Sequence, residues 1–338
     1  MRGLRKILFP FAILYGLITS IRNYFFDIGL LSSKKYKLPI IVVGNLNVGG
    51  TGKSPMVEYL IRLLQDEYKL ATLSRGYRRK SKGFVLAEDG VTSNELGDEP
   101  MQFYSKYKKC SVAVDADRQN GINKLQDIVN PEVIVLDDAY QHRKVKAGFY
   151  VLLTKYNDLY VDDYILPTGN LREARKGANR ADVIIVTKCP TELSKLDQEE
   201  ILKRIQPLKR QKVFFSSIKY DEKIFNNEKS FVLRDLKNTF TLVTGIANPR
   251  PLLGYLNSLK LKYEHIAFND HHHFSERDIE LLARKEFVIT TEKDYMRLKD
   301  RLKNVMYLPI QTQFMNNNEE FDEMIFDYIK KDLQKTGL

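Results

Sequence analysis

The chain has 338 residues, which is enough for two domains of ordinary size with a substantial core. With 43% apolar and 29% charged residues, it has the composition of a folded globular protein and not of a disordered one. Its two cysteines, Cys110 and Cys189, are too few for a disulfide framework and too scattered for a zinc site, which agrees with a reducing compartment. The net charge is +11, and its distribution is more informative than its total.

Residues 1–40 hold seven basic residues and one acidic residue, so more than half of the excess charge lies there. The apolar run at 7–18 is shorter than the roughly 20 residues that a bilayer crossing requires. We therefore expect residues 1–34 to form a helical arm that lies in a membrane interface beside anionic lipid. Two alternatives are a secretory signal, for which no small-residue cleavage site follows, and a helix packed on the protein's own core.

The sequence GNLNVGGTGKS at 44–54 lies between an apolar run at 40–43 and a stretch with helical spacing at 56–64. A strand, a glycine-rich turn and a helix start together predict a phosphate-binding loop, because backbone N–H groups then point at the anion. Lys53 is predicted to reach the outer phosphates of a nucleoside triphosphate and Ser54 to hold Mg²⁺. Asn47 stands where the strict pattern has glycine, and we expect it to adopt the positive φ that Asn tolerates. The predicted binding residues are Asn47, Val48, Gly49, Gly50, Thr51, Gly52, Lys53 and Ser54.

Strand-like runs alternate with helical stretches along the chain, which predicts a mostly parallel sheet covered by helices. A polar stretch at 220–230 interrupts the alternation, and an amphipathic segment at 319–333 closes the chain. We expect an α/β protein with a P-loop NTPase-like domain at 35–215, a linker at 216–238 and a smaller α/β domain at 239–338. The predicted strands are 38–43, 70–73, 111–114, 133–136, 150–153, 183–186, 241–244, 263–267, 288–290 and 306–308.

Three further motifs are candidates for chemistry. The apolar run at 133–136 ends in Asp137 and Asp138, the place where Mg²⁺ is usually anchored beside a phosphate loop. Asp98 precedes a predicted helix and, taken alone, is typical of an N-cap. Residues 268–274 hold three of the five histidines, which suits a metal site or acid–base work.

The basic stretch at 74–82 indicates a solvated loop or a contact with an anionic substrate. Nucleic acid is disfavoured as a partner, because the sequence has no recognition helix and no stacking platform. Thr187 and Lys188 are similar to the guanine-reading motif of GTPases, but Pro190 replaces the aspartate that would read guanine. The chain is therefore expected to use ATP.

Taken in order, these motifs resemble the lipid A 4'-kinase (tetraacyldisaccharide 4'-kinase) family from about residue 1 to 300. The sequence departs from the family pattern at Ala139, Tyr140, Ala174 and Asn269, none of which removes a charged or nucleophilic group. The matching segments are 43–55, 74–77, 97–100, 117–118, 137–142, 166–173, 245–249, 268–274 and 290–294.

The resemblance implies Mg²⁺- and ATP-dependent phosphorylation of the 4'-hydroxyl of a tetraacyl disaccharide 1-phosphate, giving lipid IVA. It places the enzyme at the cytoplasmic face of the bacterial inner membrane, with no nucleic acid and no obligate protein partner. It further implies two α/β domains with the active site in the cleft between them.

The resemblance also implies roles for individual residues. Asp98 would be the base that accepts the sugar hydroxyl proton, His271 would pair with it, and Asp270 would orient His271. Lys53 would neutralise the transferred phosphate. Mg²⁺ would lie among Ser54, Asp137 or Asp138, and Glu173. Candidates for the clamp on the substrate's anomeric phosphate are Arg75, Arg78, Arg118 and Arg172.

Two other classes of protein remain as alternatives. One is a membrane-docked nucleotide switch, such as a GTPase or metallochaperone, with the histidine cluster as its metal site. The missing guanine-reading aspartate and the pair Arg172–Glu173 speak against it. The other is a non-catalytic membrane adaptor in which the glycine loop is only structural.

Overall fold

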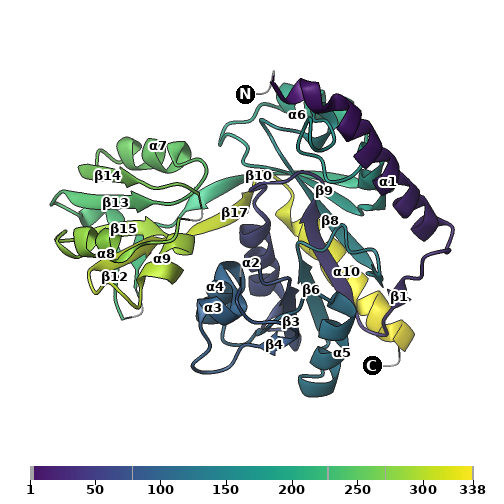
Figure 1. Cartoon of the computed structure of the whole chain (residues 1–338), viewed down its shortest axis with the longest axis horizontal. Helices are drawn as coiled ribbons and strands as arrows, with labels where there is room; N and C mark the ends of the chain where they lie inside the picture. The colour runs from purple at the N-terminus through teal and green to yellow at the C-terminus, as the bar shows by residue number, and fades with distance from the viewer. Residues whose placement is uncertain (1–3, 78, 227, 271, 337–338) are drawn as a thin grey trace.

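The computed structural model describes residues 4–77, 79–226, 228–270 and 272–336, which form two α/β domains and a separate N-terminal helix, α1 (Phe9–Asp27) (Figure 1). The strands of the larger domain are β2 (Ile40–Asn45), β3 (Leu70–Ser74), β4 (Val85–Leu86), β5 (Ser111–Val114), β6 (Val133–Asp137), β8 (Phe149–Lys155), β9 (Val183–Thr187), β10 (Lys212–Tyr220) and β17 (Ile310–Phe314), with a small separate pair, β1 (Lys34–Lys35) and β7 (Val145–Lys146). Its helices are α2 (Lys53–Leu64), α3 (Ser93–Leu96), α4 (Asp98–Lys106), α5 (Arg118–Ile128), α6 (Lys195–Ile205) and α10 (Asn318–Thr336).

The larger sheet is parallel except at its two edges. Its order over the described residues is β17-β10-β9-β8-β2-β6-β3-β5-β4, with β17 and β4 antiparallel to their neighbours. The strands are apolar on both faces because helices cover both. Ile40 and Val42 of β2 lie in the core with α5 and α6, whereas Ile41 and Val43 lie in the core with α2, α4 and α10. The predicted P-loop-type α/β fold with a mostly parallel sheet is confirmed.

The smaller domain is also a sheet between helices. Its parallel strands are β13 (Phe240–Thr244), β14 (Tyr263–Ala267), β15 (Val288–Thr291) and β16 (Val305–Leu308), extended by the antiparallel β11 (Lys223–Phe225) and β12 (Ser230–Val232). Helix α7 (Arg250–Ser258) packs on one face through Leu252 and Leu256. Helices α8 (Glu276–Ala283) and α9 (Glu292–Leu298) pack on the other through Leu282 and Tyr295.

The connection between the domains differs from the predicted linker. Strands β10 and β17 pair antiparallel, from Ser216 opposite Phe314 to Tyr220 opposite Ile310, and lead from one domain into the other (Figure 1). The rest of the expected linker, 216–238, contains β11 and β12. The prediction was wrong because the polar stretch at 220–230 is itself folded: it contains β11, whose Ile224 is buried in the core of the smaller domain.

Helix α10 corrects the boundary of the smaller domain, which we expected to extend to 338. Its apolar face, with Phe321, Ile325 and Ile329, lies in the core of the larger domain beside α2. The Tyr328 hydroxyl also accepts a hydrogen bond from the Ile40 amide at 2.9 Å. The chain therefore crosses into the smaller domain and returns.

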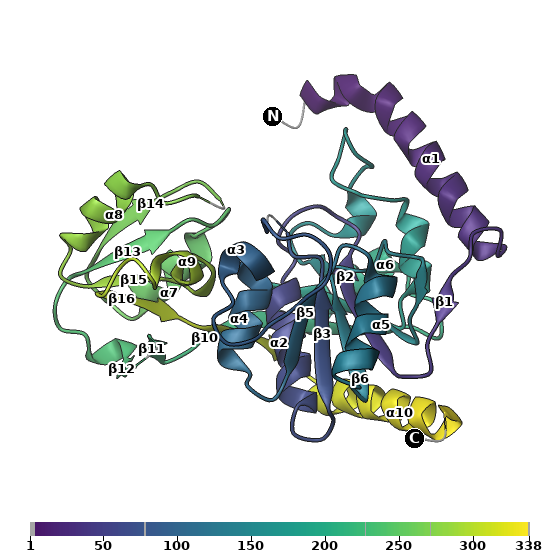
Figure 2. The same ribbon diagram turned by 60° about the horizontal axis from the view of Figure 1, so that its bottom comes forward.

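Helix α1 stands at the edge of the larger domain, and Figure 2 shows it apart from the sheet. Only Ala12 and Gly16 of this helix are buried, whereas Phe11, Leu14 and Ile18 are 63%, 56% and 57% exposed. The alternative of a helix packed on the protein's own core is therefore wrong. Within the described ranges, no helix combines the length and apolar character needed to cross a membrane.

Candidate active site

The glycine-rich loop leads from β2 into α2 at the carboxyl edge of the larger sheet. Helix α2 begins at Lys53, and Gly52 before it has a φ of +87°. Gly49 has a φ of +107°, so both positions use the left-handed conformation that glycine adopts without strain. The backbone N–H groups of the first helical turn lack helical partners, which makes this end of α2 suited to an anion.

Asn47 does not adopt the positive φ that we expected of it. It forms an isolated antiparallel bridge with Leu171, and its Nδ2 donates to Asp163 Oδ2 at 2.9 Å. The neighbouring Val48 amide donates to the Asn170 carbonyl at 2.8 Å. Position 47 therefore serves as the attachment between the phosphate loop and residues 163–173.

Charged side chains converge beside this loop. Strand β6 lies next to β2 and brings Asp137 and Asp138 to the same edge of the sheet. Lys53 Nζ lies 3.8 Å from Asp138 Oδ1, and Arg172 Nη2 lies 2.8 Å from the same oxygen. Burial alone would raise the pKa of Asp138, but Lys53 and Arg172 outweigh it and lower the pKa. Asp138 therefore holds the side chains of Lys53 and Arg172 at the place where the oxygens of a bound phosphate would contact them.

Asp137 is the residue best suited to hold a cation. Burial, with a contribution from Asp138, raises its pKa to about 6. Ser74 Oγ donates to Asp137 Oδ2 at 3.3 Å, but the buried Oδ1 has no hydrogen-bond partner among the described residues. A buried carboxylate oxygen without a partner is costly unless a cation or water meets it. Asp137, together with Ser54 in the first turn of α2, therefore fits Mg²⁺.

The described residues contain no cluster of three or more His, Cys, Asp or Glu side chains arranged to hold a metal ion. Mg²⁺ needs no such cluster, because it usually binds one or two carboxylates together with substrate phosphates and water.

Glu173 lies in a different network. Arg180 donates to both of its oxygens, at 2.8 and 2.9 Å, while Gln141 and Asn23 donate to one oxygen each. The side chain is buried and links α1 to the body of the domain. The role of Glu173 as a metal ligand stays a prediction, and this arrangement provides no unoccupied oxygen in support of it.

Asp98 is the first residue of α4 and not the N-cap, which is Gly97 with a φ of +92°. A Cβ at Gly97 would lie 3.2 Å from the Tyr77 carbonyl oxygen, so this turn also needs glycine. The Asp98 carboxylate faces the smaller domain, where Arg297 Nε donates to its Oδ2 at 3.0 Å. The structure thus places Asp98 at the junction of the two domains.

The predicted partners of Asp98 are placed only in part. His271 lies outside the described residues, as does Arg78. Asp270 is exposed after β14. The adjacent His272 stacks on Phe268 and lies 3.0 Å from Asp278 Oδ2, which makes it a structural part of the smaller domain.

The three described arginine candidates have different positions. Arg75 is exposed at the end of β3, and Arg172 lies among Asn45 and Asp138 beside the loop. Arg118 is only 2% exposed and donates to the carbonyls of Asp115 and Asp137. Because its guanidinium is enclosed, Arg118 supports the ends of β5 and β6 in this structure and does not reach a ligand in solution.

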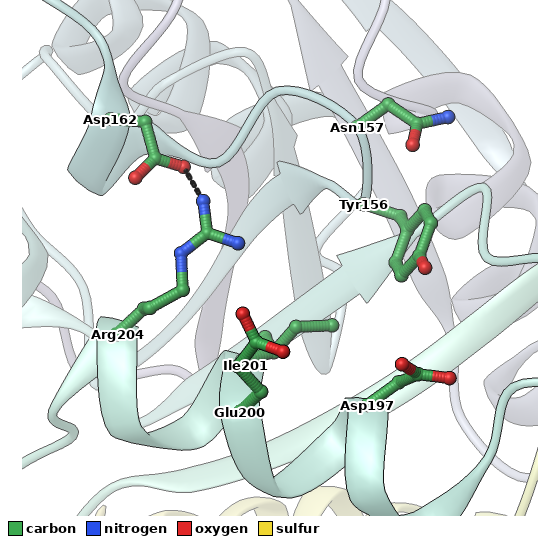
Figure 3. A pocket seen from close by; sticks show the side chains of 7 residues that line it. All are labelled: Tyr156, Asn157, Asp162, Asp197, Glu200, Ile201 and Arg204. Carbon is green, nitrogen blue, oxygen red and sulfur yellow. Dashed lines mark hydrogen bonds and ion pairs between the residues drawn. The ribbon is translucent and has the colours of Figure 1, made fainter.

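A cavity of about 250 Å³ lies elsewhere, between α6 and the loop after β8 (Figure 3). Its lining includes Asp197, Glu200 and an Asp162–Arg204 ion pair. So acidic a lining would repel a triphosphate. A second cavity, of about 240 Å³, lies beneath α1 and is basic; it is lined by Arg22, Ala116, Asp117, His142, Arg143 and Lys144.

Sequence reasoning missed the residues that the smaller domain contributes. Arg297 reaches Asp98, and Lys293 Nζ lies 3.5 Å from Glu99 Oε1. Glu99 in turn contributes to the raised pKa of Asp137. The motif at 290–294 marked this region, but nothing local indicated that α9 would lie against α4.

A lysine at a helix start, opposite a buried carboxylate with a free oxygen, is how P-loop enzymes distribute charge around a triphosphate and its metal. The larger domain is therefore a P-loop phosphotransferase domain.

A family model described as tetraacyldisaccharide-1-P 4'-kinase matches residues 4–330, and the chain belongs to this family. It is 54% identical to a tetraacyldisaccharide 4'-kinase of Flavobacterium johnsoniae over 99% of this chain and 100% of that protein. The identity to the enzyme of the same name from Bacteroides thetaiotaomicron is 41%, covering 99% of this chain and 96% of that protein. A crystal structure of LpxK from Aquifex aeolicus in complex with ATP superposes with a TM-score of 0.81 at 30% identity, covering 96% of this chain and 99% of that one.

These relationships confirm the predicted family and the kinase activity, and the Aquifex aeolicus relative was crystallised with ATP. They favour the kinase over the nucleotide switch and the adaptor.

We expect Asp137→Asn to weaken Mg²⁺ binding in the presence of nucleotide by about 10–100-fold, because the free Oδ1 would lose its charge. Titration calorimetry with ATP, with and without Mg²⁺, separates this effect from nucleotide binding itself. Asp66→Asn, in an exposed pair with Lys109, is the control. Unchanged Mg²⁺ dependence in Asp137→Asn would exclude this carboxylate as a ligand.

Proposed function

We propose that this chain transfers the γ-phosphate of ATP to the 4'-hydroxyl of an acylated disaccharide 1-phosphate at the cytoplasmic face of the inner membrane. The product would be lipid IVA, an intermediate of lipid A biosynthesis. The observation that carries the proposal is the meeting of Lys53, Asp138 and Arg172 at the phosphate loop, with Asp98 on the neighbouring helix start.

Each residue has a role that follows from its position. The backbone of the loop binds the β- and γ-phosphates, and Lys53 neutralises charge on the transferred group. Ser54 and Asp137 would hold Mg²⁺, which neutralises phosphate charge when bound. Asp98 accepts the proton of the 4'-hydroxyl as it attacks. His271 and Asp270 remain the predicted partners of this base.

Helix α1 supports a location at a membrane surface. Its apolar side chains point away from the protein, while polar contacts attach it to the active-site segment. The Tyr15 hydroxyl donates to the Arg172 carbonyl at 3.1 Å, and Asn23 Nδ2 donates to Glu173 at 2.7 Å. An exposed apolar face with basic residues nearby is typical of helices that lie in the interface. The active site would thereby be held close to lipid headgroups.

The basic cavity beneath α1 supports an anionic lipid substrate. Arg22 comes from α1 itself, and Arg143 and Lys144 come from the loop that follows Asp137 at the end of β6. Burial, together with the nearby cation Arg118, lowers the pKa of His142 to about 4. The imidazole is therefore neutral at pH 7, and the positive charge of the cavity comes from its arginine and lysine side chains. We infer that this cavity receives the substrate's 1-phosphate.

A direct assay tests the function. The protein is incubated with labelled ATP and the tetraacyl disaccharide 1-phosphate in mixed micelles, and the product is read by mass spectrometry. We expect one added phosphate, no product with Lys53→Ala, and preference for ATP over GTP. Nucleotide hydrolysis without lipid phosphorylation would contradict the proposal.

We expect the double variant Leu14→Glu/Ile18→Glu to bind anionic vesicles at least about tenfold more weakly, because each residue loses roughly 1.5–3 kcal/mol of apolar burial. Apparent KM for vesicle-borne lipid should rise while the Kd of ATP stays unchanged. Leu196→Glu, at a 77% exposed position on α6, is the matched control. Unchanged vesicle sedimentation of the double variant would refute the anchoring role of α1.

A further inference from the structure

Helices α4 and α9 form a charged contact between the two domains. Helix α9 lies against α4, and the ion pairs between them involve both ends of α4. Met101 of α4 is buried in the core of the smaller domain, between the ends of this contact. The ion pairs that join the two helices among the described residues are Asp98–Arg297, Glu99–Lys293 at 3.5 Å and Lys106–Glu292 at 2.6 Å.

Arg297 is held rigidly before it reaches Asp98. Its Nη1 donates to the His272 carbonyl at 3.4 Å and lies 3.6 Å from Asp294 Oδ1. Asp294 is fully buried and accepts hydrogen bonds from the Gly245 amide and the Thr291 hydroxyl, both at 2.8 Å. The guanidinium is therefore oriented by the loop after β13, the start of α9 and residue 272.

The contact with Asp98 is directional. Arg297 Nε donates to Asp98 Oδ2 at 3.0 Å, and Nη2 donates to the same oxygen. Both bonds go to one oxygen, so they restrain the position of Oδ2, and neither of them uses Oδ1. Arginine keeps its own protons at any working pH, so it can orient the base without competing for the transferred proton.

We propose that Arg297 is a positioning residue for Asp98, supplied by the smaller domain. The proposal rests on the role of Asp98 as base. Proton transfer requires the acceptor oxygen to be within hydrogen-bond reach and correctly oriented, and an error of about 1 Å can lower the rate about 10²-fold. The smaller domain therefore acts on the chemical step through the orientation of Asp98.

A double-mutant cycle with Asp98→Asn and Arg297→Gln tests the proposal. We expect Arg297→Gln to lower kcat about 10²-fold, with the KM of ATP unchanged. In the Asp98→Asn background the same change should have no further effect, because an orienting residue has nothing left to orient. An equal loss in both backgrounds, or a rise in kcat, would overturn the proposal.

Chemical rescue separates orientation from folding. We expect guanidinium ion at millimolar concentration to restore part of the activity of Arg297→Ala and none of that of Asp98→Asn. Arg297→Lys should keep an intermediate kcat, since it supplies one donor in place of two. Arg301→Gln is the matched control, because among the described residues Arg301 bonds to the Phe274 carbonyl and to Glu276, both in the smaller domain.

Two results would bear on different claims. Absence of rescue, with folded protein shown by an unchanged Tm, would contradict the positioning role while leaving the kinase function intact. Normal turnover of Asp98→Asn would instead contradict the proposed base and, with it, this inference.

Discussion

Asp98→Asn is expected to lower kcat for lipid phosphorylation by about 10²–10⁴-fold, the usual range for loss of a general base. The amide keeps the size of the side chain but cannot accept a proton from the 4'-hydroxyl. The Asp98 side chain is 22% exposed at the start of α4, so a substrate hydroxyl can reach it. Steady-state kinetics with saturating ATP measures the loss.

The affinity for ATP separates loss of the base from loss of the fold. Asp98 is not part of the loop that binds the phosphates, so the Kd of ATP by calorimetry should stay unchanged. Asp89→Asn is the control. This exposed carboxylate lies outside the site and accepts a hydrogen bond at 3.1 Å from Tyr104 of α4, the helix that begins with Asp98. If Asp98→Asn turns over normally while ATP binding is intact, another group must take the proton.

The phosphate loop and ten of the strands were predictable because their signals are local, whereas β10 and β17, which connect the domains, were not among the predicted strands. A strand-loop-helix unit carries its glycines and its lysine within about a dozen residues, and buried parallel strands are continuous apolar runs. The strand at Ser111–Val114 agrees at both ends with the prediction, and β6 ends at Asp137 as the acidic pair suggested.

The parts that could not be predicted depend on contacts between distant residues. The apolar period of α10 shows that one face is buried but not which core receives it, and Phe321 packs in the larger domain. Arg297 lies 199 residues from Asp98 in sequence, and Glu292 lies 186 residues from Lys106. No local pattern indicates such pairs.

Two predicted ligands show a related limit. The motifs at 117–118 and 166–173 identify segments close to the site, but not the direction in which each side chain points. Arg118 is enclosed behind the strand ends, and Glu173 is occupied by Arg180. An ionisable residue in an active-site motif can therefore support the site without touching substrate.

The second large expected effect is on stability and concerns Lys106, whose ion pairs connect the two domains. Its Nζ lies 2.6 Å from both Glu58 of α2 and Glu292 of α9, and both carboxylates are almost fully buried. Burial alone would lower the pKa of Lys106, but the two carboxylates raise it. We expect Lys106→Met to lower the free energy of unfolding by about 3–5 kcal/mol, because two buried carboxylates would lose their cation. Urea unfolding measures this, with Lys109→Met in an exposed pair as the control.

The same group makes stability depend on pH. Burial and the nearby Glu58 raise the pKa of Glu292 from its ordinary value of 4.5 to about 7. Between those two pH values, the folded protein therefore binds more protons at Glu292 than the unfolded chain does. The contribution of Glu292 to the free energy of unfolding is thus present at low pH and is lost as the pH rises toward 7. Glu292→Gln should flatten the pH dependence over this window, and the cost of Lys106→Met should shrink as pH falls, because Glu292 then takes up a proton. A Lys106→Met penalty that does not change between pH 5 and 8 would show that its charge is compensated by other groups, and that the domains are not held together by this ion pair.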